Sequence, residues 1–411
     1  MERIVITGMG TVSPLGLSVA ETWRNISEGV SGVAPLTLMD HSKLQVHIGC
    51  EVKGFNPENY MDSTEARRRD RFEQLASAAV QEAFKDSGLV ITEENAPRIG
   101  IVLSSAIGGL KSLADAVLRA EREGPRRVSP FLIPMLMGNG AAGMVAIDYG
   151  IKGPCFSVTS ACASGADGIG MALTMLRSGM IDAAVAGASE AVVTYVGIAA
   201  FDRVGAMSHH NDDFSMTPAP FDRNRDGLVM GEGAAVVVLE TESHARARGA
   251  TIYAELAGYG STSDAFHITA PHDKGEGGGN AIRQALNSAH ANAEDVGYIN
   301  AHGTATQLND VSETKAIKYA LGDLATQIPI SSTKSMTGHM MGATGALEAI
   351  LCVNAIRDGI LPPNIHYQTP DPECDLDIVA NEAREKKVDL VLSNAFGFGG
   401  HNAVLAVRRY S

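Results

Sequence analysis

A cysteine lies at a strand-to-helix boundary within residues 158–179, VTSACASGADGIGMALTMLRSG. The β-branched Val158 and Thr159 precede small residues around Cys162, and an apolar helical pattern follows from Ile169. A thiol at a helix start lies near unpaired backbone N–H groups and the positive end of the helix dipole. Both favour the nucleophilic thiolate, and the same N–H groups suit an oxyanion formed when a thioester is attacked. The alternative is an inert, buried packing cysteine.

Two histidines follow strand-like runs in the second half of the chain. His302 follows the run GYIN, and Lys334 and His339 follow the run IPIS. Because the carboxyl ends of parallel strands meet at one edge of a sheet, we expect these side chains near Cys162. Imidazoles donate hydrogen bonds or move protons near neutral pH, which suits thioester chemistry. Alternatively, each histidine is a satisfied core or surface group, or the three bind a metal, although their spacing matches no common zinc pattern.

The elements that must position these residues form an α/β pattern, because strand-like runs alternate with helical ones. The segment SVTSACASG…MLRSG in the first half resembles ISSTKSMTGHMMGATGALEAILCVNAIRDG in the second. Each is an apolar strand, a Ser/Thr-rich turn and a Gly/Ala-rich helix that ends in R-x-G. We interpret this as an internal duplication, joined at the polar stretch 242–250. The predicted halves are residues 1–249 and 250–411.

Composition excludes several classes of function. The 411 residues suffice for one large duplicated unit, and a net charge of −14 argues against a general nucleic-acid or anionic-membrane surface. The five cysteines are scattered without a CxxC pair, so neither a disulfide framework nor a zinc site is expected. The sequence contains no run of about 18 apolar residues, so no membrane span is predicted. The opening MERIVITGMG is typical of a strand rather than a signal peptide, so we expect a cytoplasmic protein.

Several motifs together resemble one family. SACASGADG, NAHGTATQLND, KSMTGH and NAFGFGGHN, in this order and spacing, are similar to the β-ketoacyl-acyl-carrier-protein synthases. The opening VITGMGTVSPLG and the segment PFDRNRDGLVMGEGAAVVVLE match the same family, so the resemblance covers the whole chain. With His339 at the third catalytic position, the chain most resembles the elongating Cys-His-His enzymes of type II. The resemblance implies a thiolase-like α/β fold of two duplicated halves, layered α-β-α-β-α, in a homodimer without cofactor or metal.

The resemblance also implies catalytic roles. Cys162 would accept the acyl group, and His302 and His339 would promote decarboxylation of malonyl-carrier protein and stabilise the enolate. Four charged residues would support them, and the alternative is a plain structural ion network. These four are Lys334, Glu348, Asp310 and Glu313.

The binding roles follow in the same way. The backbone N–H groups of Cys162 and Phe398 match an oxyanion hole, and Phe398 also matches an aromatic gate. Ile107 and Phe201 match the acyl pocket, although an isoleucine such as Ile107 is by itself more often an ordinary core residue.

The implied partner is acyl carrier protein, a small acidic protein, so local cations must offset the negative charge of the chain. The runs EARRRDRF and GPRRVSP supply Arg67 and Arg68, and Arg126 and Arg127. The alternative is that these are solvated helix faces with intrahelical ion pairs.

Some positions depart from the family pattern or stay open. His401 stands where the family usually has threonine after GFGG, and Gly205 stands where a basic residue is common. Asn300, Ser393 and Asn394 near strand ends offer ligands for a monovalent cation, with turn and cap roles as the alternative.

The expected function is elongation of acyl chains on carrier protein by decarboxylating Claisen condensation. The nearest rival is the ketosynthase of a type II polyketide system. A degradative thiolase using coenzyme A has a second catalytic cysteine near the C-terminus, where this chain has AFGFGGHN. A non-catalytic partner subunit typically lacks the nucleophile, which is present here as Cys162.

Overall fold

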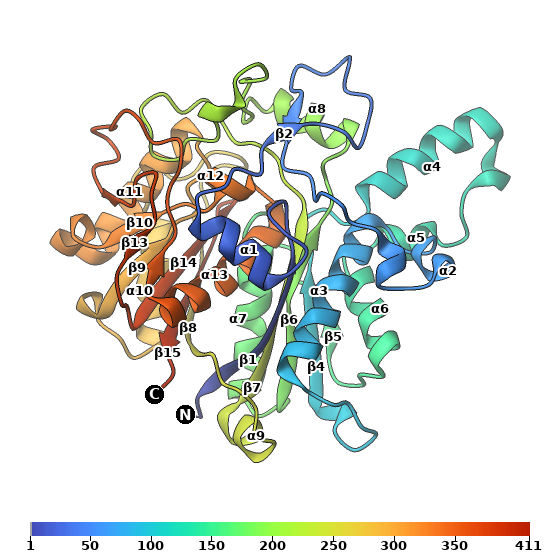
Figure 1. Cartoon of the computed structure of the whole chain (residues 1–411), viewed down its shortest axis with the longest axis horizontal. Coiled ribbons are helices and arrows are strands. Elements are labelled where there is room, and N and C mark those ends of the chain that lie inside the picture. Colours follow the sequence, from blue (N-terminus) through green and yellow to red (C-terminus); the bar gives the residue numbers. More distant parts are fainter. Residues whose placement is uncertain (1) are drawn as a thin grey trace.

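The computed structural model describes residues 2–411 and contains a continuous eleven-stranded mixed sheet (Figure 1). The principal strands of the first half are β1 (Ile4–Val12), β4 (Ile99–Ser104), β5 (Cys155–Phe156), β6 (Ala183–Glu190) and β7 (Gly233–Thr241). Those of the second half are β8 (Ala254–Ser263), β9 (Val296–Asn300), β10 (Pro329–Ser331), β14 (Leu390–Gly397) and β15 (His401–Arg409), with β12 (Asp377–Ile378) at the edge.

The two halves of the sheet have the same topology. The first half runs β5-β4-β6-β7-β1 and the second β10-β9-β14-β15-β8, so in each half the strands lie in the order third, second, fourth, fifth, first. The third, second and fourth strands are parallel, whereas the fifth is antiparallel to both of its neighbours. The predicted duplication is confirmed. The sheet is mixed rather than parallel throughout, because β1, β7, β8 and β15 complete each half as antiparallel strands.

The halves meet where β1 and β8 pair through Val5 with Glu255 and Ile6 with Ala254. The short helix α9 (Glu242–Ala247) connects β7 to β8. The predicted division between residues 249 and 250 falls in this connection, and it remains a prediction.

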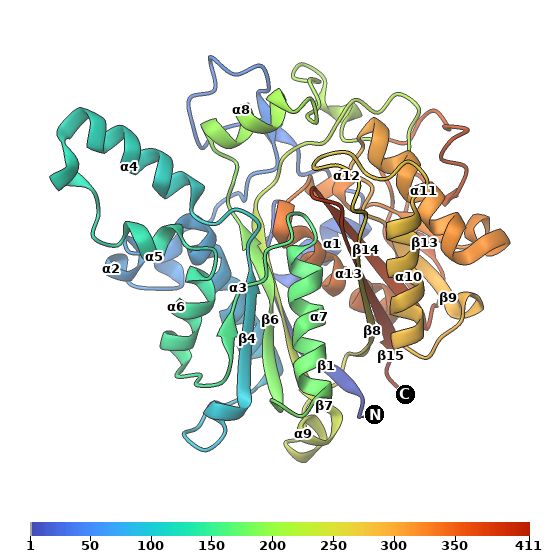
Figure 2. The same cartoon turned by 180° about the vertical axis from the view of Figure 1, so that it is seen from behind.

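Helices and half-sheets form five layers, as predicted (Figures 1 and 2). The helices α7 (Ser164–Arg177) and α13 (Thr344–Asp358) lie between the two half-sheets and share one hydrophobic core with both. A second core joins α3 (Arg71–Ser87) and α6 (Gly140–Tyr149) to the outer face of the first half. A third joins α10 (Glu276–Ser288) and α11 (Gln307–Leu321) to the second. Because it has a sheet on either side, α13 is buried from Thr344 to Ile356.

The remaining elements lie around this framework. The helix α4 (Leu110–Glu123) projects from the body and buries none of its residues (Figure 1). The other helices are α1 (Val19–Ser27), α2 (Ser63–Ala66), α5 (Leu132–Leu136), α8 (Tyr195–Arg203) and α12 (Lys334–Thr337). Two short ribbons pair β2 (Ala34–Pro35) with β3 (Ile48–Gly49) and β11 (Ile360–Leu361) with β13 (Arg384–Glu385). Within residues 2–411, no helix is long and apolar enough to cross a membrane.

The central layer generates a stability prediction. Leu173 on α7 is 1% exposed in the core shared by both half-sheets. Leu173→Ala should lower the free energy of unfolding by about 3–5 kcal/mol, because the cavity cannot collapse between two sheets. Urea unfolding followed by circular dichroism measures this change. Val90→Ala, at a side chain that is 70% exposed, should change it by no more than about 0.5 kcal/mol. Equal effects of the two substitutions would contradict the assignment of α7 to the core.

Candidate active site

The three predicted catalytic residues come from three connections of the sheet. Cys162 lies in the turn between β5, which ends at Phe156, and α7, which begins at Ser164. The predicted strand therefore ends earlier than expected, and Ala161 turns the chain with a φ of 52°. His302 follows β9, and His339 lies between α12 and α13.

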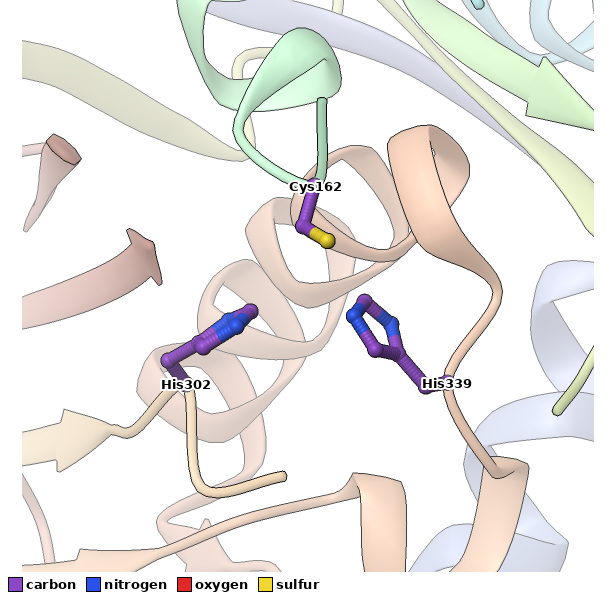
Figure 3. Close-up of side chains that lie close together, drawn as sticks. All are labelled: Cys162, His302 and His339. Carbon is purple, nitrogen blue, oxygen red and sulfur yellow. The ribbon is translucent and has the colours of Figure 1, made fainter. Parts of the chain in front are cut away.

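The structure brings these three side chains together at the carboxyl ends of their strands (Figure 3). The sulfur of Cys162 and one ring nitrogen of each histidine all lie within 4.8 Å of one another. The two imidazole rings are 5.4 Å apart between centroids and nearly perpendicular, at 84°. All three residues are buried, with exposures of 9%, 3% and 2% for Cys162, His302 and His339. The arrangement places a thiol beside two imidazoles, with little of any of the three exposed to solvent.

Burial determines the charge state of the thiol. It raises the pKa of Cys162 to about 11, and the positive charge of Lys334 and the N–H of Phe398 oppose this rise only in part. Burial therefore opposes the thiolate that the helix start favours. Because the resting group is a thiol, its proton needs an acceptor when the sulfur attacks.

The two imidazoles are neutral acceptors and donors. Burial lowers the pKa of His302 and of His339 well below 6.5, and the charge of Lys334 lowers both further. The N–H of Met341 donates to Nδ1 of His339 at 3.2 Å, so the ring proton of His339 belongs on Nε2. Nδ1 of His302 is buried without a hydrogen-bond partner in the described chain. Neutral rings can each donate one hydrogen bond to a developing oxyanion.

Two of the predicted supporting residues form a buried ion pair. Nζ of Lys334 lies 2.7 Å from Oε1 of Glu348, and both side chains are 1% exposed. Burial raises the pKa of Glu348 to about 7, although Lys334 opposes the rise. The pair supplies the positive charge that faces the thiol and both imidazoles.

The other two predicted supporting residues, Glu313 and Asp310 on α11, contact different parts of the chain. Glu313 accepts hydrogen bonds from the backbone N–H groups of His302 at 2.8 Å and Gly303 at 2.7 Å, so it fixes the backbone of the histidine. Asp310 instead accepts from the N–H of Phe221 at 2.8 Å and lies 3.7 Å from the guanidinium of Arg225. Asp310 therefore fixes the segment that contains Phe221 and Arg225, rather than the backbone of His302.

A cavity of about 260 Å³ connects the three catalytic residues to the surface. Phe201 and Phe398 line it, with their rings stacked at 6.2 Å. Ile107 does not line it and is 40% exposed near α4, so the structure does not bring Ile107 into this cavity. Sequence reasoning missed several lining residues, although the quoted motif NAHGTATQLND contains five of them, including Gln307 and Asn309. Those missed include Thr304, Thr306, Leu308, Thr269, Ala270 and Pro271.

The positions that depart from the family pattern lie near this cavity. Gly205 lines it, with a φ of 74°, so no side chain extends into the cavity at this point. His401 is exposed at the first position of β15.

The predicted docking arginines lie outside the cavity. Arg68 pairs with Glu65 at 2.9 Å and lies over the ring of Phe131 at 4.8 Å, so part of its surface is occupied within the chain. Arg126 and Arg127 border a surface hollow below α4. The neighbouring Arg69 and Arg71 are instead ion-paired to Asp148 and Glu232, and Arg67 reaches Thr64.

Three buried polar residues near the histidines retain unused oxygens. Oδ1 of Asn300, Oγ of Ser393 and Oδ1 of Asn394 have no hydrogen-bond partner within the described residues. Amide and hydroxyl oxygens are ligands for hard cations, so these residues fit a monovalent cation or ordered water.

The comparisons with known proteins define the class. The sequence matches the family described as "Beta-ketoacyl synthase, N-terminal domain" over residues 1–245, and its C-terminal domain over residues 253–368. The chain therefore belongs to the β-ketoacyl synthase family.

Its relatives are more specific. The chain is 48% identical over 409 residues to "3-oxoacyl-[acyl-carrier-protein] synthase 2" of Staphylococcus aureus (strain COL), covering 100% of this chain and 99% of that protein. A Synechocystis protein of the same name is 46% identical, covering 100% and 98%. Among solved structures, a β-ketoacyl synthase from Burkholderia phymatum matches with a TM-score of 0.93 and 34% identity over both whole chains. A type II polyketide ketosynthase, solved with its acyl carrier protein, matches at 0.92 and 33% over both whole chains.

The raised pKa of Cys162 gives a pH prediction. Alkylation of Cys162 by iodoacetamide should accelerate about tenfold per pH unit between pH 7 and 9, because the thiolate fraction rises in proportion below a pKa near 11. Peptide mass mapping measures the rate at Cys162 and, in the same samples, at the exposed Cys155 as a reagent control. A rate at Cys162 that levels off below pH 8 would show a resting thiolate instead.

Proposed function

We propose that this chain is a 3-oxoacyl-[acyl-carrier-protein] synthase that elongates acyl chains in fatty acid synthesis. The observation that carries the proposal is a buried thiol beside two neutral imidazoles at the end of a cavity. Full-length identity of 48% to "3-oxoacyl-[acyl-carrier-protein] synthase 2" supports this substrate class.

The first step is acyl transfer. The sulfur of Cys162 attacks the carbonyl carbon of an acyl thioester as its proton passes to a neutral imidazole. The N–H groups of Cys162 and Phe398 hold the resulting oxyanion, and the N–H of Phe398 already faces this sulfur. Collapse expels the carrier thiolate, which takes a proton, and leaves the acyl group as a thioester on Cys162.

The second step forms the new carbon–carbon bond. The malonyl thioester loses CO₂, and the electron pair of the broken bond forms an enolate whose oxygen accepts hydrogen bonds from His302 and His339. The protonated Nε2 of His339 is available for this role because Nδ1 accepts from Met341. The enolate carbon attacks the acyl thioester, and the tetrahedral intermediate expels the thiolate of Cys162. The product is a 3-oxoacyl thioester two carbons longer.

Acyl carrier protein is the proposed carrier of both substrates. Arg126 and Arg127 beside α4 and Arg67 and Arg68 beside α2 are the candidate docking cations, supported by the acidic character of carrier proteins. The neighbouring polyketide structure is a ketosynthase in complex with such a protein.

A second copy of this chain is the proposed structural partner. The helices α4 and α6, and α5 with the residue that follows it, expose six apolar side chains: Leu113, Val117, Leu118, Ile133, Met137 and Ile147. The adjacent β5 is also an edge strand, with backbone groups free to pair. A homodimer through this apolar face would bury both features, and Ile107 beside it would be enclosed as the predicted acyl pocket requires.

All five cysteines are free, which suits the reducing cytoplasm proposed for the protein.

The ketosynthase of a type II polyketide system remains the second candidate, because a solved ketosynthase of such a system shares 33% identity with this chain. The site chemistry is common to both, so the acyl product distinguishes them.

The function generates a two-stage prediction. Incubation with long-chain acyl-carrier protein should add one acyl group to Cys162, and malonyl-carrier protein should then release a 3-oxoacyl product two carbons longer. Cys162→Ala should accept no acyl group. His339→Ala should still accept it but release CO₂ from malonyl-carrier protein at least about 100-fold more slowly, because a donor to the enolate is lost. Intact mass and labelled CO₂ release measure the two stages. An adduct that malonyl-carrier protein leaves unchanged would favour a polyketide substrate or a non-catalytic subunit.

The apolar face generates a separate prediction. Light scattering should give the wild-type protein a mass of twice 43.1 kDa. Val117→Lys combined with Ile133→Lys should reduce it to 43.1 kDa, because two charges would be buried in the interface. Val90→Lys, in the loop after α3, should leave the mass unchanged. A wild-type monomer, or an unchanged mass for the double variant, would exclude this interface.

A further inference from the structure

Glu190, the last residue of β6, holds two segments that the sheet topology brings together. It is fully buried, with 0% exposure. The first segment, residues 105–107, follows β4. The second, residues 339–342, runs from His339 to the start of α13.

Every partner of the Glu190 carboxylate is a hydrogen-bond donor. Oε1 accepts from Oγ of Ser105 at 2.8 Å and from the N–H of Ile107 at 3.3 Å. Oε2 accepts from the N–H of Ala106 at 2.8 Å and from the N–H of Gly342 at 3.1 Å. Burial raises the pKa of Glu190 to about 7, and the four hydrogen bonds oppose this rise, so the carboxylate is mainly ionised at pH 8.

The two segments approach too closely for any side chain at residue 342. A Cβ on Gly342 would lie 2.8 Å from both the nitrogen of Ala106 and Oε2 of Glu190. Glu190 is therefore the group through which the segment of Ile107 and the segment of His339 are held against each other.

The bond to Gly342 lies next to the bond that sets the tautomer of His339. The N–H of Met341 donates to Nδ1 of His339, and Met341 adopts a positive φ of 46° to do so. The next N–H, that of Gly342, is the one that Glu190 accepts. Releasing Gly342 would let the Met341 peptide rotate away from Nδ1. The remaining contact of Nδ1 would be Oγ1 of Thr344 at 3.2 Å, which can donate or accept, so the proton of His339 would no longer be fixed on Nε2.

We propose that Glu190 is a positioning residue that holds the acyl-pocket segment with both carboxylate oxygens and the tautomer-setting turn of His339 with Oε2. The proposal rests on the proposed function for the roles of Ile107 and His339. It adds a residue that contacts neither the sulfur nor the imidazoles but positions the site through the backbone of the two segments.

A glutamine at this position tests the double role directly. Its side chain has the same length but only one acceptor oxygen, so it must lose the hydrogen bonds of either Oε1 or Oε2, and its amide hydrogens oppose the N–H groups on that side. The carboxylate charge is also one of the causes, after burial, that raise the pKa of Cys162. Glu190→Gln therefore removes both a segment contact and a negative charge near the sulfur.

The experiment compares Glu190→Gln with Glu240→Gln at pH 8. Glu240 is also 0% exposed, but it lies on β7 opposite Ala183, the first residue of β6, so it is at the far end of the same strand pair. Glu190→Gln should slow malonyl decarboxylation relative to acylation of Cys162 by about 10- to 100-fold. Glu240→Gln should leave that ratio unchanged even if it lowers stability. Equal slowing of both stages by Glu190→Gln would overturn the proposal and leave a purely structural role.

Two further measurements keep the test independent of folding and of the proposed function. Alkylation of Cys162 by iodoacetamide in Glu190→Gln should be faster at fixed pH, because the variant lacks a negative charge that raises the pKa of Cys162, and it needs no carrier substrate. Ser105→Ala frees only the acyl-pocket segment, so it should change the rates for acyl groups of different length and leave malonyl decarboxylation unaffected. Unchanged alkylation in the first variant, or slowed decarboxylation in the second, would contradict the proposal. An inactive wild-type protein would refute the proposed function while the alkylation result still stands.

Discussion

The site depends on the close approach of the two central helices. A Cβ on Gly165 of α7 would lie 2.6 Å from the carbonyl oxygen of Gly342 and 2.9 Å from the nitrogen of Ala346. Gly345 on α13 approaches Ala166 in the same way, with 3.1 Å between its Cβ position and the nitrogen. These contacts leave room only for small residues. The helix α7 follows the turn that contains Cys162, and α13 follows the turn that contains His339. The contact between the two helices therefore brings these two turns, at equivalent positions of the two halves, close together.

Burial in that central layer determines the chemistry. The same desolvation that raises the pKa of Cys162 to about 11 lowers the pKa of both histidines, so all three groups are held neutral. The buried charge near them is carried by Lys334, paired with Glu348. A neutral imidazole is a hydrogen-bond donor rather than a strong acid, which suits an enolate that must remain nucleophilic.

The sequence was sufficient for the duplication and for the grouping of the three catalytic residues, because each follows a strand at the same edge of the sheet. It was insufficient for the charge state of Cys162, since a helix start is visible in the sequence but its burial under the other half is not. The sequence also could not show which of Asp310 and Glu313, one helical turn apart, contacts the backbone of His302. In the structure only Glu313 does. Glu190 lies in no motif, because its partners are backbone groups that come together only in the fold.

The carboxylates that support the two histidines bind the backbone rather than the rings. Glu313 accepts from the N–H of His302, and Glu190 accepts from the N–H of Gly342 beyond His339. A carboxylate bonded to a ring nitrogen would stabilise the imidazolium and raise its pKa, as general electrostatics requires. Backbone contacts fix the position of each ring without that effect. The two buried acids can therefore orient the imidazoles, while burial and the charge of Lys334 keep the imidazoles neutral. Because the groups that position the rings do not charge them, both rings can act as hydrogen-bond donors.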